Sequence, residues 1–206
     1  MTCKKQLRQR LLAQRQAMST VTWQQKSDAI CHYLQDSKVI GAARMILAYA
    51  SFRQEPDLMP LWRSLLSQSQ DQRSHPSPVT VGLPRCQGKT LVWHQWHPLE
   101  SPALQPGAYG ILEPAAHLPT IDPTRLGPQD VILVPAVGCD RYGYRLGYGG
   151  GFYDRLLGIS PWKTMTTIGI TFDFSLTDRL PIEPWDQPLT TICTESGLMI
   201  PTQDRS

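Results

Sequence analysis

The stretch that decides the fold is Asp130-Val-Ile-Leu-Val-Pro135, followed two residues later by Gly138-Cys-Asp-Arg-Tyr-Gly-Tyr-Arg-Leu-Gly-Tyr-Gly-Gly-Gly-Phe-Tyr-Asp-Arg155. The first part is a short apolar run rich in β-branched residues, which is typical of a strand buried on both faces of a parallel sheet. From Gly151 the apolar residues recur at helical spacing, and Gly158 supplies a helix stop. The sequence therefore predicts a strand, a glycine-rich loop and a helix, with the loop at the carboxyl edge of a sheet, where α/β proteins bind ligands.

The loop combines glycines with arginines in a way that favours phosphate chemistry. Its five glycines are Gly143, Gly147, Gly149, Gly150 and Gly151. Because glycine has no β-carbon, consecutive main-chain N–H groups can turn toward an anion, and the start of the following helix adds to the attraction. Arg145 can add a forked, permanently charged donor. The pattern fits neither the P-loop nor the dinucleotide fingerprint, so a purely structural turn is the alternative to phosphate binding.

Asp154 follows the glycines closely enough to share their ligand. A carboxylate beside bound phosphates would be repelled unless a cation lay between them, and magnesium commonly takes one or two carboxylates together with phosphate oxygens. In the alternative interpretation, Asp154 caps its own helix or forms a salt bridge there. Spacing alone does not decide between the two.

The rest of the chain alternates strands with helices. Helices are expected over residues 4–18, 22–36 and 55–66, the last with Pro56 in its first turn, and further strands over 44–50, 79–83, 90–96, 166–171 and 189–193. Residues 98–128 contain so many prolines that an irregular surface excursion is expected there. This alternation predicts a three-layer α/β fold with a largely parallel central sheet, formed by residues 1–206 as a single domain.

Composition excludes several classes of protein. The chain has 206 residues, of which 41% are hydrophobic and 18% charged, and a net charge of +3. This charge is too small to argue for nucleic-acid binding, and no aromatic residues alternate with basic ones as a stacking platform requires. No apolar stretch reaches the length of a membrane span, so we expect a cytoplasmic protein with no membrane or nucleic-acid partner. Oligomeric state is open, with a monomer slightly favoured.

Five segments of the chain resemble the 5-formyltetrahydrofolate cyclo-ligase family, also called 5,10-methenyltetrahydrofolate synthetases. The longest is Val134–Arg155, which is similar to the signature of that family. Lys4–Arg8 resembles its N-terminal basic segment, Ser51–Glu55 its substrate-side strand end, Tyr109–Pro114 its Glu-Pro element, and Leu180–Leu189 its C-terminal segment with an aspartate. These segments occur in the order of the family and span nearly the whole chain. The family is Rossmann-like, which agrees with the predicted fold.

The resemblance implies an ATP- and magnesium-dependent cyclisation of 5-formyltetrahydrofolate to 5,10-methenyltetrahydrofolate, with release of ADP and phosphate. The formyl oxygen would attack the γ-phosphate of ATP, and N10 would then close on the activated carbon. Arg145 and Tyr153 would be the catalytic residues, and Asp154 and Asp186 would bind Mg²⁺. The nucleotide would be bound by Lys4, Arg8, Arg145, Gly147, Tyr148, Gly149, Gly150, Gly151, Phe152 and Tyr153.

On the folate side, the resemblance implies contacts from Ala50, Glu55, Glu113, Tyr148 and Phe152. Three positions depart from the family pattern: Leu58 stands where a threonine is usual, Cys139 replaces an aromatic residue, and Tyr148 occupies a place often held by arginine or methionine. The loss of the threonine hydroxyl puts folate affinity in question.

Two other functions fit the same residues. One is a kinase or ligase that uses ATP on another small amide or carboxylate. The other is a non-catalytic folate-binding protein, which the Leu58 departure would favour. A dinucleotide oxidoreductase fits least, because no acidic ribose partner follows the loop at the expected spacing.

Overall fold

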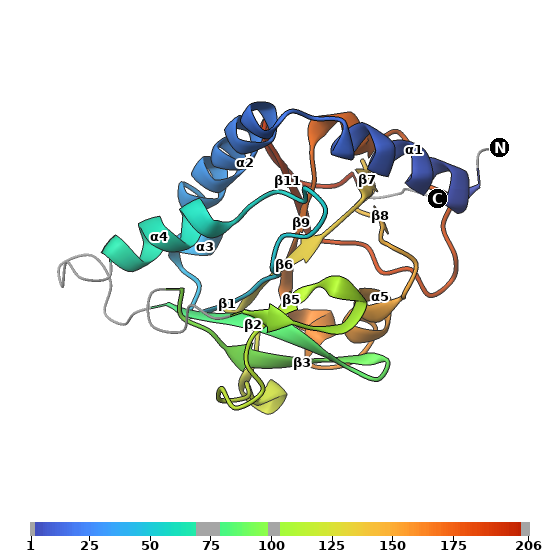
Figure 1. Cartoon of the computed structure of the whole chain (residues 1–206). Helices are drawn as coiled ribbons and strands as arrows, with labels where there is room; N and C mark the ends of the chain where they lie inside the picture. Colours follow the sequence, from blue (N-terminus) through green and yellow to red (C-terminus); the bar gives the residue numbers. More distant parts are fainter. Residues whose placement is uncertain (1–2, 69–78, 99–103, 203–206) are drawn as a thin grey trace.

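A seven-stranded sheet forms the centre of the protein in the computed structural model, which describes residues 3–68, 79–98 and 104–202 (Figure 1). The strands are β1 (Met45–Leu47), β2 (Thr80–Gln87), β3 (Thr90–Gln95), β6 (Val131–Pro135), β9 (Thr166–Ile170), β11 (Thr191–Thr194) and β12 (Gly197–Met199). Their order is β12-β11-β9-β6-β1-β2-β3, and only the two edge strands, β12 and β3, run antiparallel to their neighbours. The predicted largely parallel sheet is confirmed.

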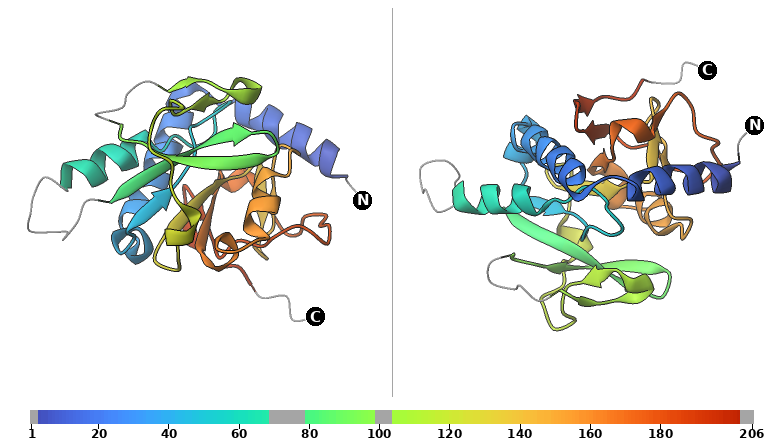
Figure 2. Two further views of the ribbon diagram at one scale, coloured as in Figure 1. Left: turned by 90° about the horizontal axis from the view of Figure 1, so that it is seen from below. Right: turned by 45° about the horizontal axis from the view of Figure 1, so that its top comes forward.

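Alternate residues of the central strands enter two separate cores, as the period of a strand requires. On one face, Ile46 and Leu133 pack with residues of α2 (Thr20–Gln35) and α4 (Met59–Gln68). On the other face, Leu47 and Ile132 pack with Leu156 of α5 (Phe152–Leu157). Two views of the ribbon show these helices on opposite sides of the sheet (Figure 2). The fold is therefore the three-layer α/β arrangement predicted from the sequence.

Helix α1 (Lys4–Gln16) packs on a smaller sheet instead of the central one. Strands β7 (Gly138–Asp140) and β8 (Arg145–Leu146) form a hairpin, and β10 (Leu176–Thr177) pairs with β7. Leu7 and Leu11 of α1 are buried against this hairpin. The helix ends at Gln16, and Ser19 then caps α2 by accepting a hydrogen bond from the Thr22 main-chain N–H at 3.1 Å.

Several predicted boundaries were wrong. The predicted helix from Glu55 begins only at Met59, because the Asp57 carboxylate accepts the Met59 N–H at 3.1 Å and Pro60, not Pro56, lies in the first turn. Residues 138–146, expected as part of the loop, form the β7–β8 hairpin.

Further short elements were not predicted. The central sheet gains β12, which pairs with β11 across Gly197. Helix α3 (Lys38–Gly41) precedes β1. The proline-rich segment, described from residue 104, contains the two-residue strands β4 (Gln105–Pro106) and β5 (Leu112–Glu113) and the 3₁₀ turns η1 (Ala108–Gly110) and η2 (Pro123–Arg125). Two more 3₁₀ turns, η3 (Trp162–Thr164) and η4 (Asp173–Ser175), flank β9.

The strand order changes direction between β1 and β6. From β1 the sheet continues through β2 to β3, whereas from β6 it continues through β9 to β12. Because β1 and β6 are parallel neighbours, their carboxyl ends lie at one edge, and the chains leaving them diverge there. Such a switch point opens a crevice that α/β proteins use for ligands. In the described part of the chain, no helix is both long and apolar enough to span a bilayer.

Candidate active site

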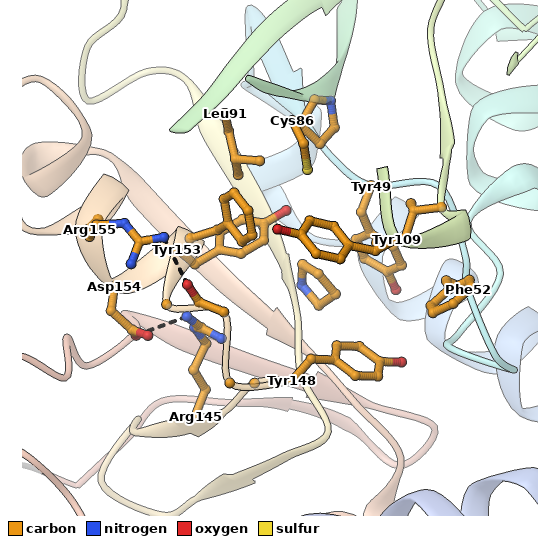
Figure 3. A pocket seen from close by; sticks show the side chains of 18 of the residues that line it. Tyr49, Phe52, Cys86, Leu91, Tyr109, Arg145, Tyr148, Tyr153, Asp154 and Arg155 are labelled. Carbon is orange, nitrogen blue, oxygen red and sulfur yellow. Dashed lines mark hydrogen bonds and ion pairs between the residues drawn. The ribbon is translucent and has the colours of Figure 1, made fainter. Parts of the chain in front are cut away.

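A cavity of about 990 Å³ lies at this switch point (Figure 3). Tyr49 and Ala50 line it from the end of β1, and Pro135 from the end of β6. All residues predicted for the site contribute to its wall: Lys4, Arg8, Ala50, Glu55, Glu113, Arg145, Gly147, Tyr148, Gly149, Gly150, Gly151, Phe152, Tyr153, Asp154 and Asp186. The fold thus brings together segments that are as much as 182 residues apart, as Lys4 and Asp186 are.

The glycine-rich loop, residues 147–151, presents its main chain to the cavity. Gly149 and Gly151 have φ angles of +101° and +66°, which glycine adopts at little cost. At Gly147 a β-carbon would lie 2.5 Å from a terminal nitrogen of Arg145, so a larger residue there would require the end of that side chain to move. Within the described residues, no main-chain N–H from 147 to 151 donates a hydrogen bond to the protein. The loop therefore offers a set of unpaired donors at the cavity wall.

Arg145 and Asp154 form an ion pair beside this loop. The Arg145 Nη2 donates to Asp154 Oδ1 at 2.9 Å, and the dashed line in Figure 3 marks this contact. The guanidinium also lies 5.3 Å from the centre of the Tyr153 ring. Its Nε is buried and has no partner in the described part of the chain. A largely buried cation with a spare donor is well placed to receive an oxyanion.

Helix α1 brings two more cations to the same side. Lys4 Nζ bonds to Asp186 Oδ2, and Arg8 Nε donates to the Gly147 carbonyl at 2.7 Å. Their i,i+4 spacing places both side chains on one helix face. Asp186 Oδ2 also accepts the Glu183 N–H at 2.8 Å, which fixes the carboxylate at the rim.

Asp154 and Asp186, the residues predicted to bind Mg²⁺, are too few to fill its coordination shell, so a bound ion would need further ligands. Within residues 3–68, 79–98 and 104–202, no three His, Cys, Asp or Glu side chains form a metal cluster. Asp154 and Asp186 line the same cavity, and each is neutralised by a cation, Arg145 and Lys4 respectively. This donor set suits a magnesium ion that takes one or two carboxylates and fills its remaining positions with phosphate oxygens and water.

Across the cavity lies the Glu55 loop, residues 51–58. The Glu55 side chain is 3% exposed and accepts the Phe52 N–H at 3.1 Å. Arg53 and Gln54 have positive φ angles of 48° and 56°, which turn the chain so that this carboxylate faces inward. Burial raises the pKa of Glu55 to about 7, although the nearby Arg15 charge and the Phe52 N–H oppose the shift.

Aromatic rings surround Glu55. Figure 3 shows Tyr49, Phe52 and Tyr109 grouped on the side of the cavity away from Arg145 and Asp154. Tyr109 is exposed, and its ring meets Phe152 edge-on with the centroids 5.9 Å apart. This side of the cavity suits a flat, uncharged heterocycle.

Glu113 lines the cavity and also connects two strands of its wall. Its Oε1 accepts the Cys86 N–H at 2.9 Å, and its Oε2 lies 3.5 Å from Arg85. These contacts tie β5 to β2 and leave the carboxylate buried. The predicted substrate contact of Glu113 stays a prediction.

Other wall residues were missed by sequence reasoning. Five lie outside the segments quoted for the family resemblance: Tyr49, Pro84, Cys86, Lys89 and Leu91. The others were considered only as parts of those segments: Phe52, Arg53, Tyr109, Ile111, Leu112, Pro135, Leu146, Arg155, Glu183 and Trp185. Tyr49 lies at the end of a predicted strand and Phe52 just beyond it, and that position was an available signal. Cys86, Lys89 and Leu91 come from the β2–β3 hairpin, whose approach to the cavity no local pattern reveals.

Two of the departures from the family pattern lie outside the cavity. Leu58 is buried in the core with Leu61 and Trp62 and does not line the wall. Cys139 is fully buried, and burial raises the pKa of its thiol to about 12, as expected for a packing residue. The third, Tyr148, does line the cavity and bonds to Arg15. The Leu58 departure therefore removes no side chain from the wall.

The sheet topology and the donor-rich cavity are typical of one class: a Rossmann-like α/β protein with a candidate ligand site at the switch point. Comparison with known proteins gives the family. The model of the 5-formyltetrahydrofolate cyclo-ligase family matches residues 1–195. The chain belongs to the 5-formyltetrahydrofolate cyclo-ligase family.

Individual relatives agree with this assignment. The 5-formyltetrahydrofolate cyclo-ligase of Mycolicibacterium smegmatis is 32% identical over 197 residues, which cover 93% of each chain. That of Escherichia coli is 46% identical over 69 residues, 32% of this chain and 37% of the relative.

Solved structures share the fold. The solution structure of Aquifex aeolicus 5,10-methenyltetrahydrofolate synthetase superposes with a TM-score of 0.78 at 28% identity and covers 98% of this chain and 95% of its own. The 5,10-methenyltetrahydrofolate synthetase of Mycoplasma pneumoniae has a TM-score of 0.71 at 22% identity, with coverage of 94% and 99%, and supports the fold alone.

Proposed function

We propose that this protein converts 5-formyltetrahydrofolate and ATP into 5,10-methenyltetrahydrofolate, ADP and phosphate, with Mg²⁺ as the metal. The observation that carries the proposal is the row of unpaired main-chain N–H groups at residues 147–151, which faces a buried carboxylate across one cavity. Such a row suits a triphosphate, and the aromatic wall around Glu55 suits a pterin. Family membership supports both substrates.

The reaction needs activation because an amide carbonyl is resonance-stabilised and its oxygen is a poor leaving group. In the proposed route, the formyl oxygen on N5 attacks the γ-phosphorus and ADP leaves. N10 then attacks the formyl carbon, phosphate departs with the original oxygen, and N10 loses its proton. Positioning and charge neutralisation supply most of the rate in such phosphoryl transfers.

On the nucleotide side, the loop amides and the cations Lys4, Arg8 and Arg145 would bind the phosphate oxygens. Arg145 would turn from Asp154 toward the transferring phosphoryl group, where its fork and its free Nε can bond equatorial oxygens. Asp154 and Asp186 would hold Mg²⁺, which would neutralise phosphate charge.

On the folate side, Glu55 would accept hydrogen bonds from the pterin N–H groups, and Phe152 and Tyr148 would pack on the rings. Ala50, three residues beyond β1, lines the same cavity and could offer main-chain groups to the pterin. Burial raises the pKa of Tyr153 well above its usual range, so its hydroxyl stays protonated. We assign Tyr153 the role of donating a hydrogen bond to the formyl or phosphoryl oxygen.

The test is direct. Protein, magnesium-ATP and 5-formyltetrahydrofolate are mixed, the absorbance of the conjugated methenyl product is followed, and ADP is assayed in parallel. We expect one ADP per methenyl group formed, and loss of both on chelation of the metal. Folate binding with no ADP formed would indicate a binding protein instead, and ATP binding with no methenyl product would indicate another acceptor.

Asp154→Asn tests the metal assignment. We expect turnover to fall by about two orders of magnitude at low magnesium and to recover partly as magnesium is raised, because one charged ligand is lost. Asp36→Asn, a change of the same kind in an exposed aspartate remote from the cavity wall, is the matched control. Equal loss in the two variants would contradict the assignment.

A further inference from the structure

Arg15 is the unexpected member of helix α1. The sequence places it with Lys4 and Arg8 on a basic stripe, yet its side chain is only 2% exposed and does not line the cavity. It lies instead behind the wall, between the Glu55 loop and the glycine-rich loop. A buried arginine is costly unless its charge and donors are used.

The guanidinium connects these two loops. Its Nε donates to the Arg53 carbonyl at 3.1 Å, and its Nη2 donates to the Tyr148 hydroxyl. Its central carbon lies 5.6 Å from the centre of the Tyr148 ring. The Nη1 atom is buried and has no partner among the described residues. Arg15 thus holds Arg53, whose φ is positive, and Tyr148, whose ring faces the cavity.

The same guanidinium is the cation that acts on Glu55. The titratable and charged groups that face this carboxylate are Arg15 from α1, Tyr49 from the end of β1, Tyr148 from the glycine-rich loop and Tyr153 from α5. Only Arg15 among them carries a positive charge. Burial raises the pKa of Glu55 to about 7, and the Arg15 charge opposes that rise.

We propose that Arg15 is a positioning residue for the folate: from behind the wall it orients the Glu55 loop and the Tyr148 ring and supplies the positive charge that faces the Glu55 carboxylate, without touching substrate. The inference rests on the proposed function, in which Glu55 receives the pterin. Neutralising Arg15 favours the protonated form of Glu55, which can no longer accept two hydrogen bonds as a carboxylate. A variant with a neutral residue at position 15 should therefore bind the folate more weakly, and this loss of affinity should become smaller as the pH rises.

The first experiment compares Arg15→Gln, Arg15→Lys and Arg10→Gln in steady-state kinetics between about pH 6 and pH 9. Arg10 is exposed on the same helix and serves as the matched control. For Arg15→Gln we expect KM for 5-formyltetrahydrofolate to rise about 10- to 100-fold at neutral pH and to approach the wild-type value at high pH. We expect kcat and KM for ATP to stay within about twofold, as for a residue that acts on ground-state folate binding.

Arg15→Lys tests whether the positive charge of Arg15 or the shape of its guanidinium group matters. It keeps the charge but not the two-armed fork, so we expect a smaller rise in KM and a pH profile like that of the wild type. If Arg15→Gln raised KM for both substrates equally, or left the pH profile of KM unchanged, Arg15 would be a structural residue only, and the proposal would be wrong.

A double-variant cycle keeps the test valid if Arg15→Gln folds poorly alone. In a Glu55→Gln background the carboxylate on which the Arg15 charge acts is absent, so adding Arg15→Gln should weaken folate binding less than it does in the wild-type background. An effect as large as in the wild-type background would overturn the proposal. Thermal unfolding of each variant identifies those that fold.

Calorimetric titration of the protein with 5-formyltetrahydrofolate alone distinguishes this inference from the proposed function. If the wild type neither binds nor converts the folate, the proposed function fails. If the wild type binds it and Arg15→Gln binds it equally well at neutral pH, the proposed function stands and the role of Arg15 is disproved.

Discussion

The two walls of the cavity differ in the number of their charged groups and in how those groups are neutralised. On the glycine-rich side, Arg145 is paired with Asp154 and Lys4 with Asp186, whereas the main-chain N–H groups of residues 147–151 donate to nothing in the described part of the protein. On the opposite side, one carboxylate, Glu55, is buried among aromatic rings with a single cation behind it. The first wall carries several charged side chains, and its two aspartates are each paired with a cation. The second wall is largely apolar, and its carboxylate is buried at a cost in free energy.

This difference shows how one cavity can take two unlike ligands. Ion pairs keep the charged wall stable before ligands bind, and a phosphate that replaced the carboxylate on each cation would leave that carboxylate for a bound metal ion. The apolar wall binds rings by area and uses one acceptor for orientation. Damage to the first wall should therefore reduce the chemical step, and damage to the second should reduce folate affinity.

The largest expected effect is on the charged wall. Arg145→Ala should lower kcat by about three orders of magnitude or more, because it removes the fork that stabilises charge on the transferring phosphoryl group. KM for the folate should change little. Single-turnover kinetics give the chemical step, and Arg125→Ala, which changes an exposed arginine away from the cavity wall, is the control. A loss confined to KM for the folate would contradict the division between the walls.

Glu55→Gln should have the next largest effect, on the apolar wall. Loss of a charge-assisted acceptor costs about 1.5–3 kcal/mol, so KM for 5-formyltetrahydrofolate should rise roughly 10- to 150-fold with little change for ATP. In the wild type, KM for the folate should increase as the pH falls below about 7, because Glu55 becomes protonated. A pH-independent KM would argue against an ionised Glu55 in folate binding.

The same substitution should stabilise the fold. A carboxyl group whose pKa is raised on folding from 4.5 to about 7 destabilises the protein once it ionises. That cost is absent below the unfolded value, grows between the two values and is complete above the folded one. Glu55→Gln should therefore gain about 1–3 kcal/mol at about pH 8 and nothing near pH 4. Thermal unfolding at the two pH values measures the difference.

A smaller effect is expected from Gly149→Ala. The φ of +101° costs a non-glycine residue about 1–2 kcal/mol, whereas the added β-carbon would meet Arg8 only at an ordinary 3.6 Å. KM for ATP should rise about 5- to 30-fold. Gly197→Ala has comparable strain, at a φ of +133°, in the first residue of β12, which does not line the cavity, and should leave KM unchanged. Equal KM values for the two variants would show that the loop conformation is unimportant for ATP.

Leu58→Thr should have the smallest effect on activity. It restores the family residue, but the side chain lies in the core and not on the cavity wall. KM for the folate should stay within about twofold, while stability falls by about 2–3 kcal/mol because an apolar side chain is replaced by a smaller polar one. A marked fall in KM would show that this position does reach the folate.

The parallel sheet and the glycine-rich part of the cavity wall could be predicted from sequence because each has a local signal, whereas Ala50, Glu55 and Glu113 were predicted only from the family resemblance. The run Val131–Val134 reads as a buried strand by itself, and the glycines after it read as an anion loop. The spacing of Lys4 and Arg8 fixes their common helix face.

What could not be predicted depends on tertiary contacts. Pro56 suits a first helical turn, but the Asp57 carboxylate starts the helix later and leaves Glu55 in a loop. Arg15 is chemically indistinguishable from its exposed neighbours on α1, and only the approach of Arg53 and Tyr148 buries it. The pairing of Arg145 with Asp154 also requires the β7–β8 hairpin, which the sequence did not predict.

The position of the Arg145 side chain beside Gly147 links the residues that natural variants can carry at these two positions. A terminal nitrogen of Arg145 occupies the volume that any larger residue at position 147 would need. Natural variation at these two positions should therefore be coupled: a side chain at 147 requires the end of the arginine at 145 to shift from its present place beside Asp154.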